Sequence, residues 1–350
     1  MRRLVILLAT VFAISCTTTE IHYTTTNGRQ IEIDDDLFDA TVISHKYQDG
    51  KGVIKFIGVI TAIKDKTFYE CENLSSITLP YGIISLGASS FMFCEKLEAI
   101  KLPNTITSIG PEAFAFCENL ESIDIPNGVT TIEYSTLLSC TSLSNVSIPE
   151  SVTTIEDSAL QNCRRLYSIN IPNSVTSIGA QAFAFCDNLS DITIPNNVKN
   201  IGSSAFKGCS SLTSITIPNS VRTIGESAFE DCEYLSTFNF GTGLSHIGPF
   251  VFRGCHNLSR VNIPSGVTVW RCELCGKSYN ITDCEYYEGI GGGYYIYSNT
   301  HPESMYCAQC CLEREEQRNR DFWRDAIKSA RNKWVDENPY EASRRGIQKF

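Results

Sequence analysis

Apolar and polar positions follow one repeating pattern along most of the chain. Nine cysteines stand 23 residues apart, from Cys71 to Cys255, and a leucine follows each of them three residues later. Apolar residues then stand two apart, as Ile215 and Ile217 do, and Pro218 follows directly. This alternation predicts a short strand with one buried face, and the proline, which has no N–H, should end it.

The second half of each unit has a different spacing. Its apolar residues stand three and then four positions apart and end in an adjacent pair: Val221, Ile224, Ala228 and Phe229. Such spacing predicts a turn or a short helical segment on the side opposite the strand. Gly225 and its equivalents in other units should permit a tight bend with positive φ.

One unit of this size cannot bury its own apolar face, so the units must stack. The predicted fold is an α/β repeat: a solenoid of 23-residue units with parallel strands on its concave face. Stacked cysteine Cα atoms about 4.8 Å apart could geometrically form disulfides. Their Cβ vectors run parallel, however, and their number is odd, so we expect a column of buried, reduced thiols.

The pattern Leu212-x-x-Ile215-x-Ile217 resembles the core of leucine-rich repeats, although Ser220 stands where many of them place Asn or Cys. The proline, the Val-x-x-Ile-Gly segment and the Ala-Phe pair before each cysteine resemble the BspA-like subgroup of bacterial surface proteins, over residues 48–270. The resemblance implies a surface scaffold for adhesion or protein–protein interaction, binding proteins, host cells or other bacteria. It does not imply an enzyme.

The N-terminus has the features of an export signal. Arg2 and Arg3 precede an uncharged apolar stretch at residues 4–14, which predicts a signal peptide over residues 1–15. The sequence Ala13-Ile14-Ser15-Cys16 resembles a bacterial lipobox, with Ala13 in place of the usual leucine. The resemblance implies lipidation of Cys16 and attachment to the outer membrane or cell surface through the lipid alone. An ordinary signal peptide with an incidental cysteine is the alternative.

Residues 16–47 should form a lipidated N-terminus and a cap over the first repeat, because an open solenoid end exposes apolar surface. Within them, Ile31–Ile33 and Val42–Ile43 have the alternation of edge strands. The first repeat is degenerate, since Gln48 occupies the cysteine position while Ile54 and Phe56 keep the apolar register.

The outward strand positions are the candidate ligand face, although they can equally be read as ordinary solvated residues. They are short and polar, and lack the aromatic anchors of strong interfaces. In the central repeats they are Ser122, Asp124, Asn145, Ser147, Ser168, Asn170, Asp191 and Thr193. The net charge of −10 argues against nucleic acid as a partner.

Residues 271–350 predict a second, small α+β domain. Two C-x-x-C pairs, Cys272/Cys275 and Cys307/Cys310, can supply the four thiolates of a structural zinc site. Tyrosine-rich strands should flank Gly291–Gly293, and an apolar stripe predicts a helix from Leu312 onward. This order resembles a treble-clef zinc finger. Disulfides that also use Cys284 and Cys311 are the rival interpretation, as is Cys311 replacing Cys310 as a ligand.

Two other classes of function remain as hypotheses. A lipoprotein that captures carbohydrate for nutrient uptake is the alternative to a protein-binding scaffold, and a glycan array would discriminate between them. An enzyme would have to act through the zinc domain. The sequence contains no phosphate loop, no Ser-His-Asp order and no recognisable carboxylate pair, so we expect no catalytic residues.

Overall fold

The computed structural model describes residues 18–248, 250–258, 264, 267–271, 278–280, 284–288 and 294–298. Contacts divide the chain into two compact units. The first comprises Met1–Trp270 with Tyr287–Tyr295, and the second comprises Arg271–Tyr286 with Ile296–Phe350.

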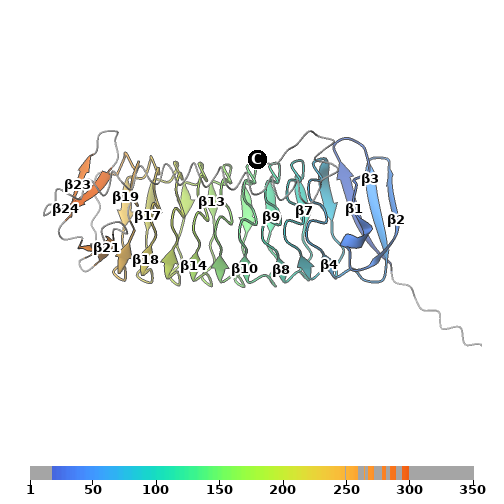
Figure 1. The fold of residues 1–350 in the computed structure, drawn as a ribbon, viewed down its shortest axis with the longest axis horizontal. Helices are drawn as coiled ribbons and strands as arrows, with labels where there is room; N and C mark the ends of the chain where they lie inside the picture. The colour runs from blue at the N-terminus through green and yellow to red at the C-terminus, as the bar shows by residue number, and fades with distance from the viewer. Residues whose placement is uncertain are drawn as a thin grey trace, which may run out of the picture. The chain divides into compact units, whose positions relative to one another are not determined.

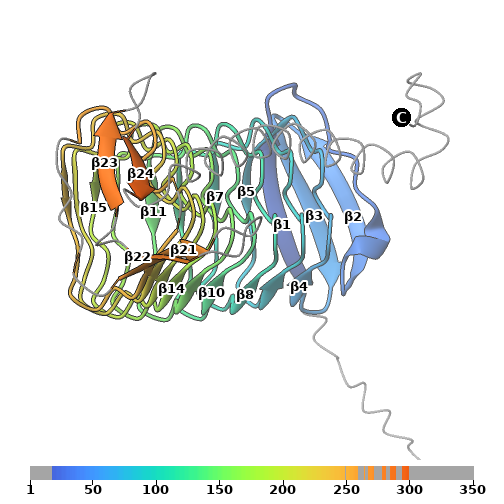
Figure 2. The ribbon, with the colours of Figure 1, turned by 60° about the vertical axis from the view of Figure 1, so that its left-hand side comes forward.

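The first unit is a solenoid of β-strands, in which successive turns lie side by side (Figures 1 and 2). Each repeat gives one strand to each of two rows of parallel strands, which we call the first and second sheets. Hydrogen bonding divides the first row after β11 and after β15, and the second row after β8. The first sheet contains β5 (Leu74–Thr78), β7 (Ala99–Lys101), β9 (Ser122–Asp124), β11 (Asn145–Ser147), β13 (Ser168–Ile169), β15 (Asp191–Ile192), β17 (Ser214–Thr216) and β19 (Thr237–Asn239). The predicted parallel strands are confirmed, since Asn145 pairs with Ser122 and Ser168 with Asp191.

The residues that form the strands of the second sheet were not predicted to be extended. It contains β4 (Ala62–Ile63), β6 (Ser85–Leu86), β8 (Ser108–Ile109), β10 (Thr131–Ile132), β12 (Thr154–Ile155), β14 (Ser177–Ile178), β16 (Asn200–Ile201), β18 (Thr223–Ile224), β20 (His246–Ile247) and β21 (Thr268–Arg271). The prolines end the first-sheet strands as expected. The carbonyl of Pro218 accepts a hydrogen bond from the Val221 amide at 3.2 Å, which closes the turn between the two sheets.

The core fills the space between the sheets with one layer per repeat. Leu212, Ile215, Ile217 and Val221 are 0 to 3% exposed. Aromatic rings stack from repeat to repeat, and Phe206 has its centroid 5.4 Å from that of Phe183 and 5.2 Å from that of Phe229. Burial of these side chains is the main favourable contribution to stability, about 1.5–3 kcal/mol for each large apolar side chain.

The third side of each repeat is a series of turns, so the turn that we predicted there is confirmed and the alternative, a short helical segment, does not form. The amides of Ser204, Phe206 and Gly208 donate to carbonyls of the next repeat at 2.7 to 2.8 Å. The intervening amides bond within their own turn, as Lys207 does to Ser204 at 3.1 Å. A helix needs every interior amide to bond within its own segment. Among the described residues the one helix is the short 3₁₀ segment η1 (Asp35–Leu37), so the repeat is a β-solenoid unit.

Positive φ angles occur on this third side, but not at the glycine for which we predicted them. Gly225 lacks a positive φ, whereas Ser227 has φ 53° and Asp231 has φ 59°. A Cβ atom on Gly225 would lie 2.4 Å from the Ser203 nitrogen and 2.6 Å from the Gly202 carbonyl carbon. The glycine is therefore required because two neighbouring turns approach each other closely, and not for its conformational freedom.

The N-terminal cap extends the first sheet with antiparallel strands. Strand β1 (Thr18–Thr25) lies between β5 and β3 (Lys51–Ile57), and β2 (Thr41–Gln48) forms the outer edge. The predicted edge strand at Val42–Ile43 is confirmed within β2. The strand expected at Ile31–Ile33 is absent, and β1 takes its place in the cap. Because β3 runs antiparallel to β1 and β2, residues 51–57 belong to the cap instead of a first repeat.

Three further strands are described beyond the repeats: β22 (Ser278–Asn280), β23 (Cys284–Glu288) and β24 (Tyr294–Ser298). Strands β23 and β24 are neighbours in a two-stranded sheet, as expected for the tyrosine-rich segments on either side of Gly291–Gly293.

Candidate ligand-binding face

The predicted ligand face lies on the outer side of the first sheet. Along the first sheet, one buried apolar residue of each repeat stands between two outward residues, as in Ser122-Ile123-Asp124, and in the strands from β9 to β19 these outward residues are polar. Of the eight predicted residues, Ser168 is half-buried and the other seven are exposed. The parallel register aligns equivalent side chains in two columns along the sheet. The result is a flat surface of hydroxyl, amide and carboxylate groups with a few charges.

One group on this side of the solenoid escaped the sequence analysis. Arg165 and Tyr167 flank the buried Leu166, so both point outward just before β13. Tyr167 is 61% exposed, and the equivalent positions in the neighbouring repeats hold the short residues Ser144 and Ser190. A tyrosine and an arginine that rise from a surface of short side chains have the composition of an interface hot spot. The signal was present in the sequence as a single aromatic residue in a column of serine, threonine and glutamate residues.

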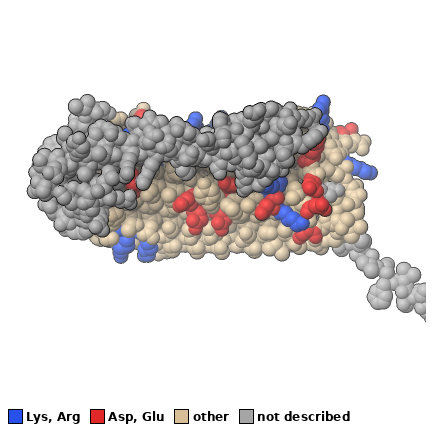
Figure 3. Space-filling model, in the orientation of Figure 1, with Lys and Arg blue, Asp and Glu red and all other residues tan. Residues whose placement is uncertain are grey.

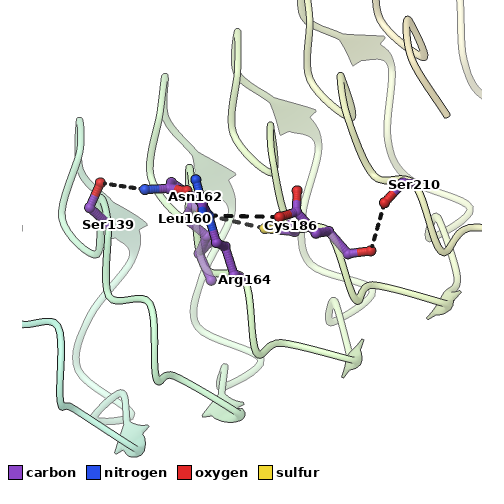
Figure 4. Close-up of polar contacts among 7 residues, drawn as sticks. Ser139, Leu160, Asn162, Arg164, Cys186 and Ser210 are labelled. Carbon is purple, nitrogen blue, oxygen red and sulfur yellow. Dashed lines mark hydrogen bonds and ion pairs between the residues drawn. The ribbon is translucent and has the colours of Figure 1, made fainter. Parts of the chain in front are cut away.

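The neighbouring arginine is used differently. The Arg164 guanidinium donates to the Asn162 side-chain oxygen at 2.8 Å and lies 3.7 Å from the Asp187 carboxylate in the next repeat (Figure 4). Burial raises the pKa of Asp187, and the positive charge of Arg164 partly offsets this effect. Arg164 thus links neighbouring repeats, which leaves Arg165 and Tyr167 as the outward pair.

The thiol column lies inside the solenoid and does not form a reactive site. All nine repeat cysteines are free, and the eight from Cys94 to Cys255 are buried. The Cys186 thiol donates to the Leu160 carbonyl of the preceding repeat at 3.3 Å (Figure 4), and its pKa is raised to about 12 by burial. A protonated, buried thiol is a poor nucleophile. The predicted column of reduced thiols is confirmed, and it ties each turn to the turn before it.

A cavity of about 410 Å³ lies near the N-terminal end, between the loop after β1 and the turn around Cys71. Polar and charged residues, including Arg29, Glu70 and Glu72, make up most of its lining. Cys71 is half-buried there, and burial raises the pKa of its thiol to about 12. The cavity therefore offers no activated nucleophile.

Acidic side chains gather over the middle and N-terminal turns of the face seen in Figure 3. Within the described part of the chain, no group of three or more His, Cys, Asp or Glu residues could hold a metal ion. The predicted zinc ligands Cys272, Cys275, Cys307 and Cys310 lie outside the described residues, as does Cys16. Among the described residues, no helix is long and apolar enough to cross a membrane.

Comparisons with known proteins agree with this architecture. A leucine-rich repeat protein from Bacteroides ovatus has a structure that matches with a TM-score of 0.54 and 25% identity. The match covers 69% of this chain and 61% of that protein, so the chain spans less than two thirds of its length. A leucine-rich cell surface protein from Faecalibacterium prausnitzii matches with a TM-score of 0.39 and 26% identity, over 65% of this chain and 76% of that one. Proteins with curated functions give no match.

The family model of the BspA type leucine rich repeat region matches residues 61–190 and 176–300. These ranges include the stacked strands and all nine cysteines of the thiol column described above. Leucine-rich repeat solenoids are extended scaffolds that present a surface to other proteins. The chain belongs to the BspA type leucine-rich repeat family.

Proposed function

We propose that the chain is an exported, non-catalytic lipoprotein that binds a protein on a host or bacterial surface through the first sheet of its solenoid. The observation that carries this proposal is the pair Arg165 and Tyr167, which stands out from the flat polar face beside Ser168 and Asp191. A tyrosine brings a large rigid contact area, and an arginine can bind carboxylates with two hydrogen bonds. Short polar side chains around them can form a rim that excludes water.

Binding of the labelled chain to intact host and bacterial cells, measured by flow cytometry, tests the proposal. The double change Arg165→Ser and Tyr167→Ser should weaken binding about tenfold or more, since hot-spot truncations cost ~2 kcal/mol or more. Tyr134→Ser is the matched control, because Tyr134 is 50% exposed but lies on the turn side, away from the first sheet. Equal binding by both variants would refute this placement. Protease treatment of the cells should abolish binding, whereas a specific hit on a glycan array would refute a protein ligand.

Anchoring through Cys16 is a separate part of the proposal. A mature N-terminal lipid would hold the scaffold on a membrane surface, because each buried methylene contributes about 0.8 kcal/mol. The sequence around Cys16 supports it. Intact-mass analysis of the membrane-extracted protein should show acyl chains on an N-terminal Cys16, and Cys16→Ala should release the protein. A non-acylated mature N-terminus would contradict the anchor.

Structural zinc in the C-terminal region is also part of the proposal, and it rests on the chemistry of four thiolates in two C-x-x-C pairs. Elemental analysis should find one zinc ion per chain, which Cys272→Ala together with Cys275→Ala removes. Disulfides are the competing outcome, and they would appear as linked peptides in a non-reducing digest.

A further inference from the structure

Exposed apolar side chains gather at the N-terminal end of the first unit. The described residues include nine large apolar side chains with substantial exposure, and five of these lie in or beside the cap. We name these five the cap patch: Ile43, Ile57, Val59, Tyr81 and Ile84, which are 46 to 80% exposed. The other four are spread over separate repeats, from Tyr134 to Tyr234. A contiguous apolar patch on a surface that is otherwise polar indicates an interaction.

The backbone brings the five residues together. Thr41 pairs with Ile57, and the bulge between Val42 and Ser44 turns Ile43 outward beside this pair. Val59 follows Ile57 after Gly58. A Cβ atom added to Gly82 would lie 3.3 Å from the Cγ1 atom of Val59, so Val59 lies against Gly82. Tyr81 directly precedes this glycine. The Ile84 amide donates to the Thr61 carbonyl at 2.6 Å, so Ile84 lies one turn along from the same segment.

The described part of the chain begins at this patch. Thr18 is the first residue of β1, and it pairs with Ile57. Cys16 is only two residues before Thr18. Consecutive Cα atoms are about 3.8 Å apart, so the Cα of Cys16 lies at most about 7.6 Å from that of Thr18. A lipid on Cys16 therefore starts beside the cap patch, and a tether this short cannot carry the bilayer surface away from it.

We infer that the cap patch is a membrane-docking surface, which rests on the bilayer in which the Cys16 lipid is inserted. This inference rests on the lipid anchor of the proposed function. Aliphatic side chains enter the boundary between headgroups and acyl chains, and tyrosine prefers this interface because its ring is apolar and its hydroxyl is polar. Docking sets the first turns of the solenoid against the membrane. The pair Arg165 and Tyr167, four repeats along from Tyr81, remains free for a partner.

Hydroxyl-radical footprinting of the intact lipidated chain tests the inference without a substitution. The chain is reconstituted in phosphatidylethanolamine/phosphatidylglycerol vesicles and compared with soluble Cys16→Ala protein, and side-chain oxidation is read by mass spectrometry. Tyr81 should be oxidised severalfold more slowly on vesicles, and Ile57 and Ile84 should follow it. Tyr167 and Tyr234, 61% and 59% exposed, are internal controls and should react at the same rate in both samples.

The outcomes separate the inference from the anchor. If mass spectrometry shows acylated Cys16 but Tyr81 is oxidised as fast on vesicles as in solution, the docking surface is refuted and the anchor stands. Absence of acylation overturns both. If Tyr81 is protected in the soluble Cys16→Ala protein as its concentration rises, the occupant is a second copy of the chain, which also refutes the inference. A Tyr81→Ser and Ile84→Thr variant, still acylated, should lose the protection of Ile57.

Discussion

The column of buried thiols should make the solenoid sensitive to alkaline pH. Burial raises the pKa of Cys140 and Cys186 to about 12. It also raises the pKa of five further thiols well above the usual value of 9.0: Cys94, Cys117, Cys163, Cys209 and Cys232. In the unfolded chain these thiols ionise at their usual pKa, so above that pH the native state binds more protons. The free energy of unfolding is therefore unaffected below about pH 8 and falls as the pH rises beyond 9.

The size of the effect follows from the same linkage. At pH 10, one unit above the unfolded pKa of 9.0, each thiol that stays protonated lowers the free energy of unfolding by about 1.4 kcal/mol. Seven such thiols together lower it by roughly 10 kcal/mol, which is comparable with the whole stability of an ordinary domain. Repeat proteins can unfold in segments, so each segment should lose stability in proportion to the thiols it contains.

Urea unfolding followed by far-UV circular dichroism measures this loss, in a phosphine reductant at about pH 7.5 and pH 10. The matched variant carries Cys140→Ala and Cys186→Ala, which removes two titrating groups from the column. Between the two pH values, the free energy of unfolding should decrease in both proteins. The decrease should be about 2.8 kcal/mol smaller in the variant than in the unchanged chain. Tyrosines and lysines titrate equally in both proteins and cancel. An identical pH-dependent loss in the two proteins, or none in the unchanged chain, would refute the reasoning.

Three further substitutions test contacts between repeats, each by the urea midpoint. Gly225→Ala should destabilise by ~1–3 kcal/mol, because its Cβ would lie 2.4 Å from a backbone nitrogen. Gly225→Asn should be no more stable than Gly225→Ala. A more stable asparagine variant would show that the position requires a positive φ after all. Phe206→Ala should lower the free energy of unfolding by ~3–5 kcal/mol, because it removes a ring stacked between two others. Phe206→Leu should lower it far less, since leucine fills the equivalent position in two other repeats. Similar losses in the two variants would exclude the ring stack as the cause. Glu230→Ala should cost ~1–3 kcal/mol, because it removes the buried carboxylate that lies 2.9 Å from Lys207 and 3.4 Å from Arg253, whose side chains are partly exposed. A neutral result would show that the ion pairs do not stabilise this end.

The first-sheet strand of each repeat could be predicted from the sequence because its signal is local. Ile215 and Ile217 alternate with polar residues, and Pro218 marks the end of the extended segment. Each of these residues reports its own burial or backbone restriction, independently of neighbouring repeats. The outward positions follow from the same alternation: seven of the eight predicted residues are exposed, and Ser168 is half-buried.

The third side could not be predicted in this way. Its apolar spacing fits a helix, but Ser227 and Asp231 adopt left-handed conformations that neither residue type indicates strongly. These turns are held by hydrogen bonds from backbone amides to carbonyls of the adjacent repeats, as from Asp231 to Arg253 at 2.7 Å. Such hydrogen bonds exist only after the repeats have stacked. The cap itself was predicted, but its strand β1 was missed for a related reason. Strand β1 has few apolar residues, and its partners β3 and β5 are distant in sequence.

Close contact between repeats also explains why the period is so strict. The turn at Gly225 lies so close to the previous turn that there is no space for a side chain at this position. The Cys232 thiol donates a hydrogen bond to the Phe206 carbonyl, 26 residues earlier, at 3.2 Å. An inserted or deleted residue in this segment would break both contacts, so the spacing stays at 23, as in the pairing of Thr223 with His246. After Cys255, the last cysteine of the column, the next pairing joins His246 to Thr268, 22 residues on. The period changes where the thiol column ends, as expected if these contacts, and not the strands alone, set the length of the unit.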